Sequence, residues 1–200
     1  MKKLRIISFI LLICIIFNAC SSAALKDDAQ AEAKQEPAQV YIIPESYFRF
    51  CNTDRDKAIQ TYKELGEDYC TDAKAVDGDM YVYLTETQRY NLIERNDEYI
   101  DQLLDEFKKE SEDYSYKCDD SYRKLTFFYD EKIEMTKEVN GVFGAAAGYG
   151  LNQILKYNDP NWSVDIEIIN CHTNKQVVKI NIPNDSVKIG DYEWQQSYKS

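Results

Sequence analysis

Apolar residues recur every three to four positions between residues 85 and 107, which is the spacing of an amphipathic helix that buries one stripe. Thr85 and Gln88 match a capping box, in which each side chain satisfies a backbone N–H at the helix start. Asn96 is the polar exception on the apolar stripe. We therefore predict a long helix that begins after Thr85 and packs one face against a core.

Two more helices are expected. One covers residues 54–65, where Gly66 offers the left-handed stop that ends many helices. The other runs from residue 131 to about 155, with Asp130 as its N-cap. Four glycines between 141 and 150 lie in this second helix, without the Gly-Lys-Ser/Thr sequence of a phosphate-binding loop. We interpret them as a surface for close packing against another element.

Alternation of apolar and polar residues predicts strands between the helices. The expected strands are residues 80–84, 114–118, 122–129, 162–169 and 176–182. Asp77-Gly78 is a turn before the first strand, and Asp119-Asp120-Ser121 joins the second and third as a hairpin. The residues expected to face the core are Met80, Val82, Leu84, Leu125, Phe127, Val164, Ile166 and Ile168.

These elements run β-α-β-β-α-β, with an extra N-terminal helix and an extra C-terminal strand. This is the order of the ferredoxin-like split βαβ arrangement, an α+β fold in which two helices cover one face of a single sheet. Hydrophobic residues make up 44% of the chain, enough for a core, and no repeat of fixed period is visible. We therefore expect one α+β domain over residues 40–200.

The N-terminus is typical of a secretion signal. Three basic residues among the first five precede an apolar run at 6–17, which is too short to span a bilayer as a helix. The run ends in Phe17-Asn18-Ala19-Cys20, which resembles the lipobox of bacterial lipoproteins. The resemblance implies that residues 1–19 are a signal peptide and that Cys20 carries a diacylglyceryl anchor on the extracellular face of the cell membrane. A cut after the small residues at 22–24 would instead give a secreted protein.

The polar composition of residues 20–39 predicts a flexible tether between the anchor and the domain. The segments KELG at 63–66, DG at 77–78 and TNKQV at 173–177, with the order of elements, resemble small lipoproteins of Clostridia-like bacteria. Those lipoproteins have no known function, so the resemblance supports an extracellular location and implies no activity.

Charge and composition limit the partners and the chemistry. The 35 Asp and Glu residues outnumber the 24 Lys and Arg residues for a net charge of -11, which disfavours binding to nucleic acid. His172 is the single histidine. Neighbours on a strand point to opposite faces, so we interpret Cys171-His172 as a structural cysteine beside a surface histidine. The cysteines also lack a zinc-site spacing. We predict no metal, no cofactor and no enzymatic activity.

Four cysteines lie in the predicted domain, and an even number outside the membrane suggests two disulfides. In the expected sheet, Cys118 and Cys171 end strands at opposite edges, about 14 Å apart, beyond the reach of a disulfide. The strand directions then favour the pairs Cys70–Cys171 and Cys51–Cys118. Free thiols in a reducing habitat are the alternative.

Side chains that point away from the two long helices would form an open face of aromatic and charged residues: Tyr81, Tyr83, Tyr122, Lys124, Phe128, Asp165 and Glu167. Such a face suits a sugar, a peptide or a protein partner, although cross-strand packing or the helix at 54–65 would also cover it. We therefore expect a membrane-tethered, non-enzymatic binding or structural module for a cell-envelope or extracellular partner. The alternatives are a solute- or glycan-binding accessory protein and a carboxylate-dependent extracellular hydrolase.

Overall fold

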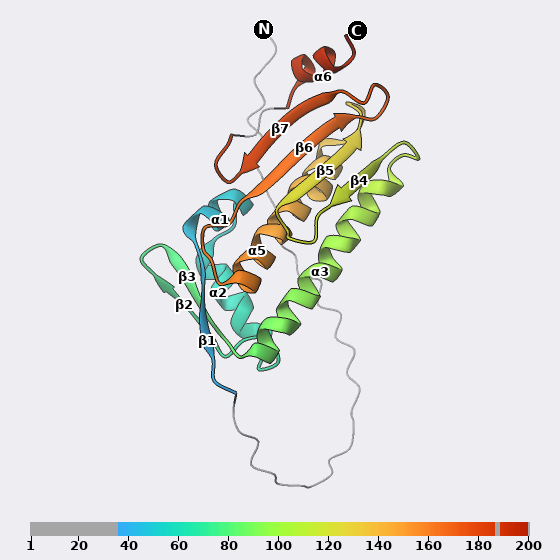
Figure 1. Ribbon diagram of the computed structural model, residues 1–200. Helices are drawn as coiled ribbons and strands as arrows, with labels where there is room; N and C mark the ends of the chain where they lie inside the picture. The colour runs from blue at the N-terminus through green and yellow to red at the C-terminus, as the bar shows by residue number, and fades with distance from the viewer. Residues whose placement is uncertain (1–35, 187–188, 200) are drawn as a thin grey trace, which may run out of the picture.

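The computed structural model describes residues 36–186 and 189–199, and the predicted signal peptide and Cys20 lie outside this range. Figure 1 shows the arrangement of its elements. In chain order they are β1 (Gln39–Ile43), α1 (Glu45–Cys51), α2 (Arg55–Glu64), β2 (Asp72–Val76), β3 (Asp79–Leu84), α3 (Glu86–Lys109), β4 (Ser115–Cys118), β5 (Lys124–Tyr129), α4 (Met135–Glu138), the π-helix η1 (Val139–Gly144), α5 (Ala145–Tyr157), β6 (Val164–Asn170), β7 (Gln176–Ile182) and α6 (Asp191–Ser197).

The larger sheet has the order β4-β5-β6-β7. β5 and β6 are parallel and are joined through α4, η1 and α5, whereas β4 and β7 pair antiparallel at the two edges. Helices α3 and α5 pack on one face of this sheet (Figure 1), where the ring of Phe107 in α3 lies 5.2 Å from that of Phe127 in β5. All eight residues predicted to face the core are completely buried.

The smaller sheet has the order β1-β3-β2 and is antiparallel throughout. Asp77 and Gly78 form its hairpin turn with φ angles of 46° and 96°, as the sequence predicts. The mixed α+β class is therefore confirmed, but the chain does not form the single ferredoxin-like sheet that we expected. β1 and β2 occupy both edges of β3, so β3 has no edge left with which to join β5 or β6.

The predicted start and end of α2 and the predicted start of α3 are confirmed. Asp54 caps α2 by accepting a hydrogen bond from the Lys57 N–H at 3.0 Å, and Gly66 takes a φ of 86° after its end. Thr85 and Gln88 form the capping box of α3 in both directions. These ends are set by local hydrogen bonds, which is why the sequence alone identifies them.

The helix expected at 131–155 starts later and is broken into three consecutive pieces, α4, η1 and α5. Asp130 does not cap it, because its carboxylate accepts hydrogen bonds from the Tyr114 hydroxyl and the Lys132 N–H instead. The first turn of α4 begins after Glu134, which makes no side-chain cap.

Glycines bring this helix against α3, as the sequence predicts. A Cβ added at Gly144 would lie 2.9 Å from Leu103 Cδ1, and one added at Gly148 would lie 2.5 Å from Ile100 Cγ1. Asn96 lies in the same interface, where its Nδ2 donates to the Gly148 carbonyl at 2.8 Å. Asn96, the polar residue on the apolar stripe of α3, thus hydrogen-bonds the backbone that Gly148 leaves accessible.

One hydrophobic core extends from the small sheet through α3 and α5 to the large sheet and α6. In the described part of the chain, no helix has the length and apolar character needed to cross a bilayer.

Candidate functional site

The predicted aromatic and charged face is divided between the two sheets. Tyr81 and Tyr83 lie on β3 in the small sheet, where both remain half-buried. The Lys74 ammonium lies 4.7 Å from the centre of the Tyr83 ring. Packing across the strands therefore covers part of this aromatic pair, while α2 packs toward the opposite face with Met80.

The other predicted face residues belong to the large sheet or to the loop before it. Lys124 and Glu167 form an ion pair at 3.3 Å, and Asp165 accepts a hydrogen bond from Asn181 at 2.7 Å. Phe128 lies beneath the Lys117 ammonium at 5.1 Å. Tyr122 precedes β5 and donates to Asp97 of α3 at 3.0 Å, away from the sheet face. The seven residues therefore do not form one continuous surface.

The four cysteines of the described chain are free, so the predicted disulfides are not formed in this structure. Cys70 is next to Thr71, whose hydroxyl donates to Gln88 at the start of α3. Cys171 lies beyond the other end of that helix, next to Asp130. The 24 residues of α3 are about 36 Å long, which separates Cys70 from Cys171. Cys51 and Cys118 contact different tyrosines, Tyr47 and Tyr149.

A groove of about 1050 Å³ lies between the α1–α2 segment and the helices α3 and α5. Its volume is slightly above the usual range of about 300–1,000 Å³ for small-molecule sites. Met80 and Ile43 of the small sheet lie at one wall, and Gly148 with Ala147 of α5 lies at another. Five aromatic rings line it: Tyr47, Phe48, Tyr62, Tyr69 and Tyr99. None of these residues belongs to the predicted binding face.

The polar groups of the groove are arranged around its aromatic rings. The Arg95 guanidinium lies 5.4 Å from the centre of the Tyr69 ring, within the range of a cation–π contact. Asn91 donates to the Asp68 carbonyl at 2.9 Å. Burial raises the pKa of Tyr62 and Tyr99 further above that of an ordinary phenol, so both stay protonated well beyond neutral pH. Tyr47 and Phe48 are buried in the core, so the partly exposed rings that remain for a ligand are those of Tyr62, Tyr69 and Tyr99.

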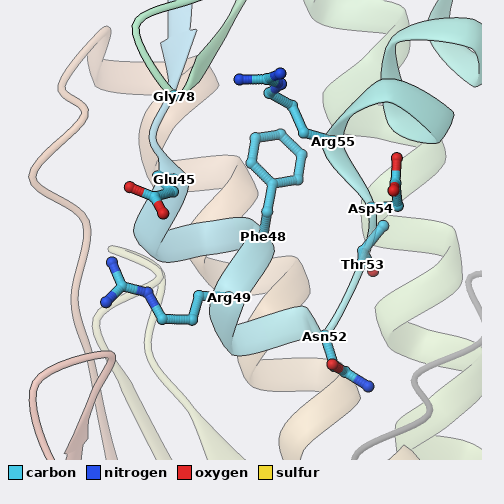
Figure 2. A pocket seen from close by; sticks show the side chains of 8 residues that line it. All are labelled: Glu45, Phe48, Arg49, Asn52, Thr53, Asp54, Arg55 and Gly78. Carbon is cyan, nitrogen blue, oxygen red and sulfur yellow. The ribbon is translucent and has the colours of Figure 1, made fainter.

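A second, more open pocket of about 580 Å³ continues from the groove and shares Phe48 and residues 52–54 with it. Figure 2 shows the Phe48 ring at its centre, below the Arg55 side chain, while Glu45 and Arg49 point away from the ring. The Arg55 guanidinium pairs with Asp56 at 3.1 Å. This pocket adds no aromatic residue to those of the groove, and its other lining residues at the end of α1 and the start of α2 are polar or charged.

A separate cluster lies at the carboxyl ends of the parallel strands β5 and β6. Asp130 follows β5, and Cys171 and His172 follow β6; one ligand atom from each lies within 4.8 Å of the other two. His172 Nε2 is 2.9 Å from Asp130 Oδ2. Carboxyl ends of parallel strands are a common place for functional groups. We did not predict this cluster, because the ferredoxin-like order would place another strand between these two.

The electrostatics of this cluster differ from those of an activated thiol. Burial and the Asp130, Asp113 and Glu131 carboxylates raise the pKa of Cys171. Burial opposes ionisation of Asp130, but hydrogen bonds from Tyr114, His172 and the Lys132 N–H outweigh it and lower the pKa of that carboxyl. The cluster is therefore an anionic site beside a protonated thiol.

Comparison with known proteins gave no match to a family model, to a curated protein or to a solved structure.

Proposed function

We propose that this chain is a lipoprotein tethered to the extracellular face of a bacterial membrane, and that its domain is a non-enzymatic module that binds a solute in the groove between α2 and α3. The lipobox-type Cys20 supports the tether, and the large groove with five aromatic rings supports solute binding. The groove favours the solute- or glycan-binding reading over a flat docking face, because the predicted face is divided between two sheets.

The chemistry of the groove supports a neutral, hydroxyl-rich ligand of the carbohydrate class. Aromatic faces stack on the apolar side of a sugar ring, while amides and carboxylates bind its hydroxyl groups. The acidic lining residues outnumber the basic ones and therefore disfavour an anion. The acidic residues are Asp54, Asp68, Glu94 and Glu98, and the basic ones are Lys57 and Arg95.

The Cys171 environment argues against a nucleophilic cysteine at this cluster. A nucleophilic cysteine requires a stabilised thiolate, usually from a nearby cation or a helix N-terminus. Here carboxylates surround the thiol and raise its pKa, which is the opposite effect.

The binding proposal can be tested with N-acetylglucosamine oligosaccharides as the probe and titration calorimetry as the measurement. Tyr99 is 37% exposed in the groove, so Tyr99→Ala should weaken binding about two- to tenfold without unfolding the domain. Tyr90→Ala is the matched control, because Tyr90 is also on α3 but is 62% exposed outside the groove. Equal affinities for the two variants, or no binding of the probe by the native chain, would contradict the proposal.

The tether is tested separately by labelling cells with radioactive palmitate. We expect label on the native chain and none on Cys20→Ala, which should also leave the membrane fraction. A chain that is exported without label would show the secreted alternative to be correct.

A further inference from the structure

We propose that Asp130, Cys171 and His172 bind one Zn²⁺ ion at the carboxyl ends of β5 and β6. They supply one oxygen, one sulfur and one nitrogen donor, all within 4.8 Å of one another. Three such protein ligands with a water molecule as the fourth is a common zinc coordination. This inference is independent of the proposed groove function, because the groove lining includes none of the three residues.

The distances require little rearrangement. Zinc bonds of about 2.0–2.1 Å to nitrogen and oxygen and about 2.3 Å to sulfur put tetrahedral ligand atoms roughly 3.3–3.6 Å apart. His172 Nε2 and Asp130 Oδ2 are 2.9 Å apart as a hydrogen-bonded pair, so they must separate slightly. The His172 side chain is 42% exposed and can make this adjustment without disturbing the core.

The surroundings already hold the ligands in place, as outer-shell groups do in known metal sites. Asp130 Oδ1 accepts hydrogen bonds from the Tyr114 hydroxyl at 2.7 Å and from the Lys132 N–H at 2.9 Å. This leaves Oδ2 facing His172. Asn170 Oδ1 accepts the His172 N–H at 2.9 Å and fixes the turn that carries both Cys171 and His172.

Charge favours a divalent cation. One thiolate and one carboxylate balance a charge of +2, and the Asp113 and Glu131 carboxylates add negative potential near the sulfur. The Lys132 ammonium is 3.9 Å from Asp130 Oδ2, but its side chain is 78% exposed and can turn into solvent. Binding releases the thiol proton of Cys171 to solvent. The Nε2 proton that His172 donates to Asp130 gives way to the metal, and the bound neutral imidazole carries its proton on Nδ1.

The test uses the full chain, purified in detergent with reduced thiols and freed of metal by a chelator. Zn²⁺ is added in competition with a chromogenic chelator, and Co²⁺ serves as a spectroscopic probe of the thiolate. We expect one ion per chain, a thiolate-to-cobalt charge-transfer band, and a Tm that rises with Zn²⁺ concentration. Cys171→Ser should remove the band and weaken Zn²⁺ binding at least about tenfold, whereas Tyr114→Phe should weaken it about 10–100-fold and keep the band.

Cys118→Ser is the matched control, because Cys118 is exposed and its strand places it at the opposite end of β5. It should bind both ions like the native chain. Circular dichroism checks that each variant is folded. The proposal is overturned if the native chain binds less than one Zn²⁺ at micromolar concentration, or if Cys118→Ser loses the cobalt band while Cys171→Ser keeps it.

Discussion

The contact between Gly150 and Trp162 predicts an unusual effect of alanine in a helix. Gly150 lies inside α5, where replacing glycine by alanine ordinarily stabilises a helix by about 1 kcal/mol. Here the added Cβ would lie 2.3 Å from Cε3 and 2.6 Å from Cζ3 of the Trp162 ring. The rings of Tyr47 and Phe50 lie 5.5 Å and 5.7 Å from that ring and hold it in place.

The two effects can be compared. Overpacking a core costs about 1–3 kcal/mol, and a rigid ring at this distance places the cost at the upper end of that range. After the gain in helix propensity, Gly150→Ala should lower the free energy of unfolding by about 2 kcal/mol. For a domain of this size the Tm should fall by about 4–8 °C.

The assay is urea and thermal unfolding of Gly150→Ala, Trp162→Leu and the double variant, followed by circular dichroism. Trp162→Leu removes the ring atoms, so in that background Gly150→Ala should become stabilising by up to about 1 kcal/mol. The change of sign is the diagnostic result. If Gly150→Ala destabilises both backgrounds equally, the ring contact is not the cause and the reasoning is refuted.

Three further predictions concern single features of the fold. Gly66→Ala should lower the free energy of unfolding by about 1–2 kcal/mol, because Gly66 has a φ of 86°. No atom lies within 4 Å of the added Cβ, so this cost is backbone strain and not a clash. Gly66→Asn should therefore cost less, and urea titration of both variants measures the difference. Burial raises the pKa of Glu138 above its ordinary value of 4.5 despite the Tyr129 hydroxyl that donates to it, so the folded state binds this proton more tightly. The stabilisation from this group is therefore full at low pH and is lost as pH rises through the folded pKa of Glu138. Glu138→Gln should remove this pH-dependent loss when the free energy of unfolding is measured between pH 4 and 8. An unchanged pH profile would contradict the assignment. Asn152→Ala removes the donor to the Asp97 carboxylate and should lower the free energy of unfolding by about 1–3 kcal/mol, as measured by urea titration. A loss no larger than that of the control Asn91→Ala would show that the buried hydrogen bonds contribute little to stability.

Local patterns predicted the elements whose signals are contained within a few residues. The capping box at Thr85, the stop at Gly66 and the burial of Val82 and Ile166 depend on periodicity and local hydrogen bonds. The later start of the second long helix was not predicted, because Asp130 pairs with Tyr114 and His172 instead of capping the helix.

Strand pairing could not be predicted in the same way, because the choice of partner is made across long separations in sequence. β1 reaches β3 with Ile43 opposite Met80, and this pairing decides that β3 leaves the large sheet. The short helix α1 and the C-terminal α6 were also missed, since helices of one to two turns carry little periodic signal.

The candidate sites follow from these pairings. The predicted aromatic face assumed that Tyr81 and Phe128 share a sheet, and they do not. The cluster of Asp130 with Cys171 requires β5 and β6 to be parallel neighbours, a fact that neither segment contains by itself.

The glycines that face α3 also limit which substitutions evolution can accept. A Cβ added at Gly141, Gly144 or Gly148 would lie 2.5–2.9 Å from side chains of α3. A homologue that keeps the α3–α5 contact must therefore retain these glycines or carry smaller side chains at the opposing positions of α3. Asn140, which is exposed in the same segment, carries no such restriction. In diverged relatives, the three glycines should therefore outlast most of the surrounding sequence as a recognisable signature.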